Sequence, residues 1–271
     1  MRLWLKASCL SALALGVGAV AFGADRPSGY LAPGEFDVTH VIEPAPRKGD
    51  PRYETDRKIF KATRALVGTP RWQLATNDAE INARALLRDF SCSVGVVLTP
   101  ESAPHVANVI ARAARDTGAQ TSRAKEFYQR NRPYTIDKGR ICQAPAELYD
   151  EKAHRVSYDY PSGHTTYGWT HALVLAALAP DRAQQILERG RAYGDSRFIC
   201  GAHNESAVEG GMLSASATMA LVATKTAYQA DLSAARAELA ALRASGPQPQ
   251  GCETEAALLA QHVMPNLGRD H

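Results

Sequence analysis

The stretch Tyr158-Asp-Tyr-Pro-Ser-Gly-His-Thr-Thr166 leads directly into an apolar segment from Tyr167 to Ala179. Proline ends whatever element precedes it, Ser162 is a preferred N-cap residue, and Gly163 lets the backbone approach a ligand closely. Residues 163–179 are apolar on nearly every face, which predicts a helix that is buried on all sides.

A helix that begins in this way directs unpaired backbone N–H groups, and the positive end of its dipole, towards whatever lies in front of it. An anion, and phosphate above all, suits that position. His164 lies in the first turn, where it can donate or accept a proton. Most Ser-Gly-His tripeptides are only capped helix starts, so this motif alone does not identify an anion site.

Two flanking segments add strong cations and a second histidine. Upstream, Lys125 and Arg132 are seven residues apart, a spacing of two helical turns that predicts both on one helix face. Downstream, Ser196-Arg197 is followed by His203. Three cations that converge on a helix N-terminus would neutralise a phosphoryl group and the charge that develops during its transfer. Two histidines could then act as nucleophile and acid.

The ordered motifs Lys-x6-Arg-Pro, Pro-Ser-Gly-His and Ser-Arg-x5-His resemble the signature of the type-2 phosphatidic acid phosphatase and vanadium haloperoxidase superfamily. Three further segments are most similar to the secreted bacterial class A non-specific acid phosphatases: Phe90-Ser-Cys92, Arg123-Ala-Lys-Glu126 and Gly194-Asp-Ser-Arg197. The similarity extends from about Phe90 to Gly211. It implies an all-α, single-domain helical bundle whose active site is formed at helix ends, and it implies acid phosphatase activity.

The resemblance also assigns roles to the matching residues. It implies that His203 attacks phosphorus and forms a phosphohistidine, while His164 protonates the leaving alcohol and then activates water. The residues expected to bind the phosphate oxygens are Lys125, Arg132, Ser162, Gly163 and Arg197. No metal or other cofactor is expected, because fixed cations neutralise the charge; phosphate or vanadate could occupy the site. An acidic medium suits this chemistry, which needs one neutral and one charged histidine.

One position departs from the family pattern. That pattern continues His-x3-Asp, but Ala207 occupies the position of the aspartate that orients the nucleophilic histidine. Asn204, Glu205 or Glu209 could substitute for it, and the sequence favours none of them. Disturbing the orienting acid of a hydrolase triad costs about 10⁴ in rate, so by analogy an uncompensated His203 would have low activity.

Three functions stay open at this point. We favour an acid phosphatase that acts on small, soluble phosphomonoesters. The alternatives are a vanadate-dependent haloperoxidase and a phosphate-binding relic in which Ala207 marks weakened catalysis. A membrane lipid phosphatase is disfavoured, because the longest apolar stretch after residue 23, Ala172 to Pro180, is shorter than the roughly 20 residues of a membrane span.

Residues 1–23 have the pattern of a secretory signal peptide. Arg2 and Lys6 precede an apolar stretch from Leu10 to Phe22 and a small-x-small cleavage site. Cleavage would yield a periplasmic or secreted bacterial protein with no membrane contact afterwards. It would also lower the formal net charge from +3 to +1, and without a basic run we expect no nucleic-acid partner. The sequence does not decide whether the chains form a homo-oligomer.

Export would place the remaining cysteines in an oxidising compartment. These form an even set: Cys92, Cys142, Cys200 and Cys252. Two disulfides are therefore expected, in a pairing that the sequence leaves open. A zinc site is disfavoured, because the chain has no Cys-x2-Cys or His-x3-His spacing.

The chain is expected to divide into a signal peptide (1–23), an extended, proline-rich N-terminal arm (24–60), a helical acid phosphatase domain (61–245), and a linker with a short C-terminal helix (246–271). Helices are predicted over 53–66, 71–87, 99–116, 119–131, 163–179, 183–196, 205–243 and 252–263. We further expect a buried helical segment at 90–98 and an active-site loop at 134–159. His171, in the middle of a helix, is assigned to the core.

Overall fold

The computed structural model describes residues 27–267, so the predicted signal peptide lies outside the described residues. The described part is mostly helical, and its only strands form one short hairpin, which confirms the all-α prediction. Its α-helices are α1 (Pro51–Thr63), α2 (Pro70–Asn77), α3 (Ala83–Asp89), α4 (Ser91–Val94), α5 (Pro104–Tyr128), α6 (Gly163–Leu178), α7 (Ala183–Cys200), α8 (Glu205–Val222), α9 (Thr226–Ser245) and α10 (Cys252–Leu259).

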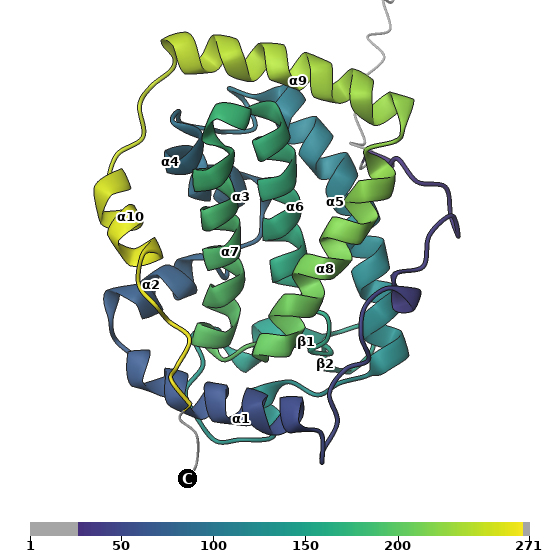
Figure 1. Cartoon of the computed structure of the whole chain (residues 1–271), viewed down its shortest axis with the longest axis vertical. Helices are drawn as coiled ribbons and strands as arrows, with labels where there is room; N and C mark the ends of the chain where they lie inside the picture. Colours follow the sequence, from purple (N-terminus) through teal and green to yellow (C-terminus); the bar gives the residue numbers. More distant parts are fainter. Residues whose placement is uncertain (1–26, 268–271) are drawn as a thin grey trace, which may run out of the picture.

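Helix α6 is the centre of the bundle and packs against α5, α7 and α8 (Figure 1). The predicted apolar helix is confirmed, since Val174 and Leu175 are completely buried. The amphipathic helix α5 contributes Val106 and Val109 to the same core. Burial of apolar surface from four helices therefore fixes α6 in the middle of the molecule.

Helices α6 and α7 approach each other closely because glycines lie at their contacts. A Cβ atom added at Gly190 would lie 2.5 Å from Cβ of Ala172. One added at Gly168 would lie 2.3 Å from the ring of Tyr193. Any side chain at these positions would push the two helices apart. The end of α7 would then lie farther from the start of α6.

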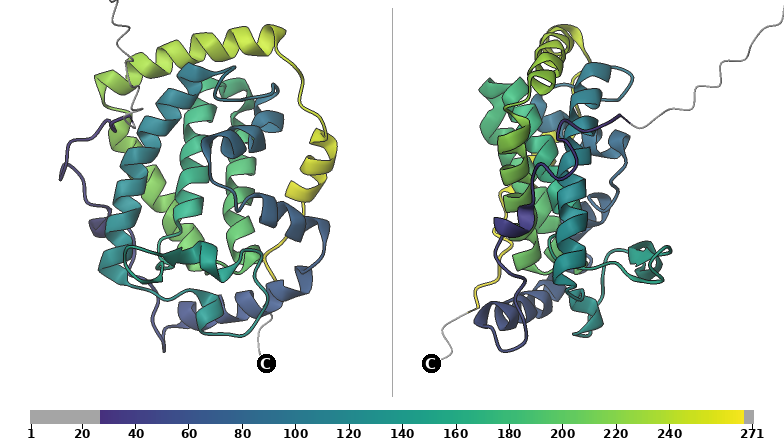
Figure 2. Two further views of the ribbon diagram at one scale, coloured as in Figure 1. Left: turned by 180° about the vertical axis from the view of Figure 1, so that it is seen from behind. Right: turned by 90° about the vertical axis from the view of Figure 1, so that its right-hand side faces the viewer.

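The ends of the bundle helices define one face of the molecule. In Figure 1, α6 begins, α7 ends and α8 begins at the same lower end, near α1, whereas α9 crosses the opposite end. The hairpin of β1 (Tyr149–Asp150) and β2 (Arg155–Val156) is antiparallel, with Tyr149 opposite Val156. It lies at this lower end and projects to one side of the bundle in Figure 2. It belongs to the segment 134–159, which we expected to be a loop.

Two disulfides join distant parts of the chain, and the structure gives the pairing that the sequence leaves open. Cys92 is bonded to Cys252, and Cys142 to Cys200. The first connects α4 to the start of α10, which was predicted as a short C-terminal helix. The second connects the segment 134–159 to the end of α7.

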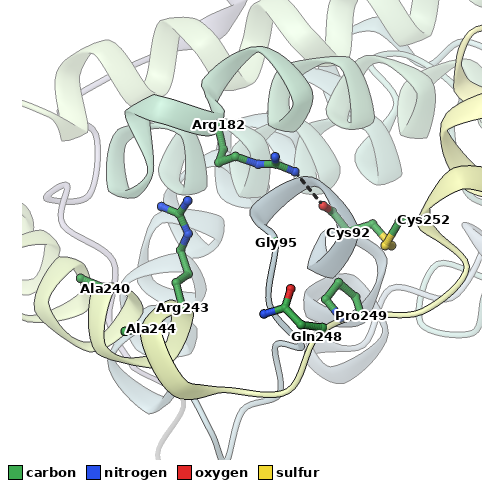
Figure 3. A pocket seen from close by; sticks show the side chains of 9 residues that line it. All are labelled: Cys92, Gly95, Arg182, Ala240, Arg243, Ala244, Gln248, Pro249 and Cys252. Carbon is green, nitrogen blue, oxygen red and sulfur yellow. Dashed lines mark hydrogen bonds between the residues drawn. A yellow bond between two sulfur atoms is a disulfide. The ribbon is translucent and has the colours of Figure 1, made fainter.

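A surface pocket of about 740 Å³ lies beside the disulfide between Cys92 and Cys252 (Figure 3). Both of its cations have partners: Arg182 donates to the carbonyl oxygens of Cys92 and Ser93. Arg243 forms two hydrogen bonds with Asp181. Arg243 is therefore paired with a carboxylate, whereas Arg182 is bound, among the described residues, only by backbone carbonyls.

Several helix boundaries differ from the prediction for identifiable reasons. The helix predicted over 71–87 is interrupted, because α2 ends at Asn77 and Asn82 caps α3 by accepting a bond from the N–H of Ala85. In the segment 90–98, Gly95 has a left-handed conformation with φ of 86° and ends a single turn, so the predicted buried helix was largely wrong.

Two predicted helices merge and one divides. Helix α5 runs without a break through Gly118, whose missing side chain leaves room for Tyr167 of α6, so the prediction of separate helices at 99–116 and 119–131 was wrong. The helix predicted over 205–243 is two helices, α8 and α9. Of the arm predicted over 24–60, the described residues 27–50 contain only a short 3₁₀ helix (Val38–His40), and α1 then begins at Pro51 with Asp50 as its N-cap. Within residues 27–267, no helix is both long enough and apolar enough to cross a membrane.

Candidate active site

The start of α6 has the predicted N-cap. The hydroxyl oxygen of Ser162 accepts a hydrogen bond from the backbone N–H of Thr165 at 3.3 Å. The N–H of Ser162 donates to the carbonyl of Ala207 at 2.8 Å, which ties this turn to α8. The N–H groups of Gly163 and His164 are then left without partners inside the helix. These two donors and the helix dipole form the first half of an anion site.

Lys125 and Arg132 do not lie on one helix, in contrast to the prediction. Helix α5 ends at Tyr128, and Gln129 follows with a left-handed φ of 51°, so the two cations do not share a helical face and that prediction was wrong. A Cβ added at Gly163 would lie 3.9 Å from Cε of Lys125, which places Lys125 beside the start of α6. Nη1 of Arg132 lies 3.0 Å from Nε2 of His203.

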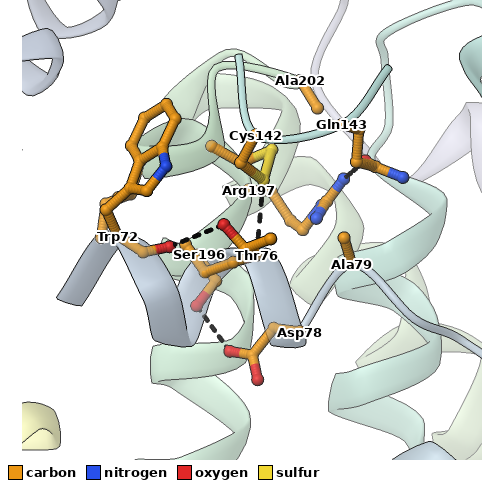
Figure 4. Close-up of a disulfide and its surroundings, with 12 residues drawn as sticks. Trp72, Thr76, Asp78, Ala79, Cys142, Gln143, Ser196, Arg197 and Ala202 are labelled. Carbon is orange, nitrogen blue, oxygen red and sulfur yellow. Dashed lines mark hydrogen bonds between the residues drawn. A yellow bond between two sulfur atoms is a disulfide. The ribbon is translucent and has the colours of Figure 1, made fainter. Parts of the chain in front are cut away.

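Arg197, on the last turn of α7, is completely buried but incompletely paired (Figure 4). Its Nη2 donates to Oε1 of Gln143, whereas its Nε and Nη1 have no hydrogen-bond partner among the described residues. Two other buried arginines do have carboxylate partners: Arg189 pairs with Asp78, and Arg130 with Asp56. A buried guanidinium with two unused donor atoms is costly unless an anion occupies the adjoining space.

Gln143 is a site residue that the sequence analysis missed. The N–H of Cys142 donates to the carbonyl of Cys200 at 3.0 Å, and the disulfide between the same residues fixes this segment to the end of α7. Gln143 follows directly and therefore faces Arg197 (Figure 4). Its position next to a cysteine was the available signal.

The two histidines face each other with their ring centroids 6.4 Å apart. Nδ1 of His203 lies 2.8 Å from the carbonyl oxygen of Asp159 and 3.0 Å from its Oδ1. Carbonyl and carboxylate oxygens only accept, so Nδ1 carries the proton and Nε2 carries the lone pair. Nε2 of His164 lies 3.0 Å from the carbonyl of Ala79 and is protonated for the same reason, which leaves Nδ1 of His164 to exchange a proton.

Asp159 is the second site residue that the sequence analysis missed. It is completely buried, and its carboxylate accepts bonds from the backbone N–H of Asn204 at 3.1 Å and from its side-chain amide at 2.7 Å. Of the residues considered as substitutes for the family aspartate, Asn204 thus contacts Asp159 rather than His203, and Glu209 forms an ion pair with Arg52. The available signal was an acidic residue within the stretch that leads into the Ser-Gly-His motif.

Burial and the surrounding cations shift the pKa values of the site. Burial, together with Arg132, Lys125 and Arg197, holds the pKa of His203 well below its ordinary value. Burial and Arg197 lower the pKa of His164 in the same direction. Burial and Arg132 lower the pKa of Lys125 to about 7. Both rings are therefore neutral at neutral pH, and the charged histidine that the expected chemistry needs forms only under more acidic conditions.

The remaining histidine of α6 is part of the core, as predicted. His171 is buried, its Nδ1 lies 2.8 Å from the carbonyl of Tyr167, and its ring stacks on Phe90. The site consequently uses two histidines and three cations. His203, Arg132 and Arg197 are buried, whereas Lys125 and His164 keep part of their surface exposed.

Comparisons with known proteins agree with this geometry. The model of the PAP2 superfamily matches residues 106–231, a range that includes every candidate site residue named from the sequence. The acid phosphatase of Zymomonas mobilis is 39% identical over 213 residues, which cover 79% of each chain. The non-specific acid phosphatase of Salmonella typhimurium is 36% identical over 199 residues, 73% of this chain and 78% of the relative. That of Providencia stuartii is 32% identical over 209 residues, 77% of this chain and 83% of the relative. This chain belongs to the PAP2 superfamily and, within it, to the class A non-specific acid phosphatases.

Proposed function

We propose that this chain is an exported, metal-independent acid phosphatase that hydrolyses small phosphate monoesters through a phosphohistidine intermediate. The observation that carries the proposal is the buried guanidinium of Arg197, whose Nε and Nη1 have no hydrogen-bond partner in the described part of the chain. Its charge contributes to the lowered pKa of both His164 and His203, whose rings lie 6.4 Å apart.

Substrate binding uses the three cations and the helix start. The phosphoryl oxygens accept hydrogen bonds from Arg197, Arg132 and Lys125 and from the N–H groups of Gly163 and His164. Ser162 keeps these N–H groups in position as the N-cap of α6. Because the cations are fixed before the substrate arrives, they stabilise the charge that develops on the phosphoryl group during transfer.

The first chemical step transfers the phosphoryl group to His203. The lone pair on Nε2 attacks phosphorus in line as the bond between phosphorus and the ester oxygen breaks. The leaving alkoxide takes the proton held by Nδ1 of His164 and departs as an alcohol. The proton on Nδ1 of His203 remains on the ring, so the phosphohistidine formed is cationic and interacts favourably with the carboxylate of Asp159.

The second step hydrolyses this intermediate. His164, now neutral, accepts a proton from a water molecule as that water attacks phosphorus. The bond between phosphorus and Nε2 breaks, inorganic phosphate is released, and both histidines return to their starting states. His164 therefore acts first as an acid and then as a base.

Acidic conditions favour this cycle because His164 must carry an extra proton when the substrate binds. Burial and Arg197 oppose that proton. A bound phosphate dianion offsets the charge of Arg197 and raises the pKa of His164, so the substrate itself promotes protonation. The low pKa of His203 keeps the nucleophile neutral under the same conditions.

Export and metal independence rest on separate observations. Cysteines paired as Cys92 with Cys252 and Cys142 with Cys200 suit an oxidising compartment, in agreement with the predicted signal peptide and a periplasmic or secreted location. Three protein cations supply the charge neutralisation that a metal ion provides in many other phosphoryl-transfer enzymes. We therefore expect activity to survive chelation.

The test is p-nitrophenyl phosphate hydrolysis by the purified protein, from acidic to neutral pH, with EDTA and without added metal. We expect turnover that vanadate inhibits and that His203→Ala abolishes. Turnover that disappears with EDTA and returns with a divalent metal would contradict metal independence. Peroxide-dependent halide oxidation with added vanadate, measured on the same preparation, distinguishes the haloperoxidase alternative. Phosphate binding without turnover would support the relic.

A further inference from the structure

We propose that Asp159 is the acid that positions the nucleophile. In the family pattern an aspartate at position 207 has this role; here a residue from a different part of the chain would have it instead. This inference rests on the proposed function, because it assigns a partner to His203 as nucleophile. It identifies a residue four positions before Gly163, in a segment that no family motif assigns to catalysis.

The contacts of Asp159 satisfy the oxygens of its carboxylate. The carboxylate is completely buried, yet Oδ1 accepts from His203 and from the backbone of Asn204, and Oδ2 accepts from the side-chain amide of Asn204. Nε of Arg130 lies 3.7 Å from Oδ2 and adds a positive charge. A buried carboxylate is tolerated when its lone pairs are satisfied in this way.

The backbone explains how position 159 can replace position 207. The N–H of Asp159 donates to the carbonyl of Arg130 at 2.8 Å. Three residues further along the chain, the N–H of Ser162 donates to the carbonyl of Ala207, also at 2.8 Å. The segment 159–162 therefore lies along the start of α8. Tyr160, the neighbour of Asp159, and Ala207 are both buried in one apolar cluster, so the two segments are packed against each other.

The carboxylate of Asp159 supplies a negative charge, which the carbonyl of the same residue cannot supply. The carbonyl oxygen, 2.8 Å from Nδ1, is sufficient to hold the ring in its tautomer. Attack on phosphorus makes the imidazole of His203 cationic, and only the carboxylate places a negative charge beside it. Loss of that charge should reduce kcat, whereas the phosphate-binding cations and hence KM should be unaffected.

The competing explanation is that Asp159 only supports the fold. Asp159 and Asp56 share the same buried arginine, since Arg130 donates to Oδ2 of Asp56 at 2.7 Å. Asp56 also accepts from the N–H and hydroxyl of Ser206, but it has no bond to His203 among the described contacts. Asp56→Asn is therefore a matched control that disturbs the same network without touching the histidine.

The experiment compares Asp159→Asn, Asp56→Asn and His203→Ala in p-nitrophenyl phosphate hydrolysis, with thermal unfolding measured for each. We expect Asp159→Asn to lower kcat roughly tenfold to a hundredfold, the loss of one charged hydrogen bond, with KM unchanged. Asp56→Asn should lower the unfolding temperature but not kcat. Unchanged kcat in Asp159→Asn, or an equal loss of kcat in Asp56→Asn, would overturn the inference.

His203→Ala separates this inference from the proposed function. If His203→Ala still turns over substrate, the nucleophile has been assigned wrongly, whatever Asp159 does. If it is inactive while Asp159→Asn is fully active, only the role of Asp159 fails. Should Asp159→Asn not fold, ¹⁵N NMR of the wild-type histidines tests the geometry that the inference requires: a proton on Nε2 of His203 instead of Nδ1 would overturn it.

Discussion

Nη1 of Arg132 lies 3.0 Å from Nε2 of His203, the nitrogen that the bonds of Nδ1 leave unprotonated. The guanidinium is held there by further bonds to the carbonyl oxygens of Ser157 and Ala202. In the proposed mechanism, a phosphoryl group that binds Arg132 is consequently brought next to the nucleophile. Arg132 would then couple substrate binding to attack from an extended segment rather than from helix α5.

Arg132→Lys should therefore impair catalysis although it keeps the charge. A lysine cannot reproduce the planar fork that contacts two carbonyls and the histidine together. We expect kcat/KM for p-nitrophenyl phosphate to fall roughly a hundredfold. Arg112→Lys is the control, because Arg112 pairs with Asp231 away from the site and its replacement should leave kcat/KM unchanged. Wild-type kinetics in Arg132→Lys would count against this role.

Gln143→Glu tests whether the uncompensated charge of Arg197 binds the substrate. A glutamate at this position would form an ion pair with Arg197 and cancel the charge that attracts phosphate. Vanadate and phosphate should inhibit this variant more than tenfold less strongly than the wild type, by the strength of a charged hydrogen bond. Gln143→Ala removes the same contact without adding charge and should weaken inhibition less. Equal inhibition constants for the two variants would show that charge at Arg197 is not what binds the anion.

The pH profile of kcat/KM should rise towards acidic pH. His164 acts as an acid only when protonated, and its pKa is lowered, so this form is gained as pH falls. Lys125, with a pKa of about 7, loses its charge as pH rises through neutrality and weakens phosphate binding there. Steady-state kinetics across this range check the direction. Lys125→Arg should make the decline near neutral pH shallower, and an unchanged profile in that variant would exclude Lys125 as its cause.

An exchange of acids between two positions is a demanding test of the site. Asp159→Ser removes the carboxylate, and adding Ala207→Asp in the same chain restores one from α8. Because both segments border the same apolar cluster, the double variant should regain a large part of the kcat lost in the single variant. Ala207→Glu with Asp159→Ser is the control, since the longer side chain does not fit the same geometry. No recovery with Ala207→Asp would mean that the two positions are not interchangeable.

Glu205 should make the folded state sensitive to pH. Burial, with Glu209 and Asp56 nearby, raises the pKa of Glu205 from 4.5 to about 8. The folded state then binds a proton more tightly than the unfolded chain, so the free energy of unfolding falls as pH rises between these two values. Glu205→Gln should flatten this decline in thermal melts taken at several pH values. The exposed Glu253→Gln should leave it unchanged, and an equally steep decline in Glu205→Gln would refute the assignment.

The sequence was sufficient to predict features that depend on neighbours along the chain. The Ser162 cap, the buried helix α6 and the separation of His164 from the core histidine His171 all follow from local spacing and hydropathy, and the structure confirms them. The structure places Lys125 beside the start of α6 and Arg132 beside His203. The prediction that these two cations share a helical face was wrong, because Gln129 turns the chain into a left-handed conformation before Arg132.

What the sequence could not predict depends on contacts between distant segments. Asp159 and His203 are 44 positions apart, and Gln143 and Arg197 are 54 apart. No periodicity records such pairs, since they are produced by the packing of α7 and α8 against the segment 134–159. The missing aspartate at 207 was visible in the sequence, but the carboxylate that faces the histidine became visible only in the folded chain.

The most direct test of the account is to trap the phosphoenzyme. Purified protein is mixed with ³²P-labelled substrate, quenched in denaturant at alkaline pH, where a phosphohistidine survives and acyl phosphates do not, and digested for peptide mapping. The account predicts label on the peptide that contains His203, and none in His203→Ala. Label on another residue, or turnover by His203→Ala, would contradict it.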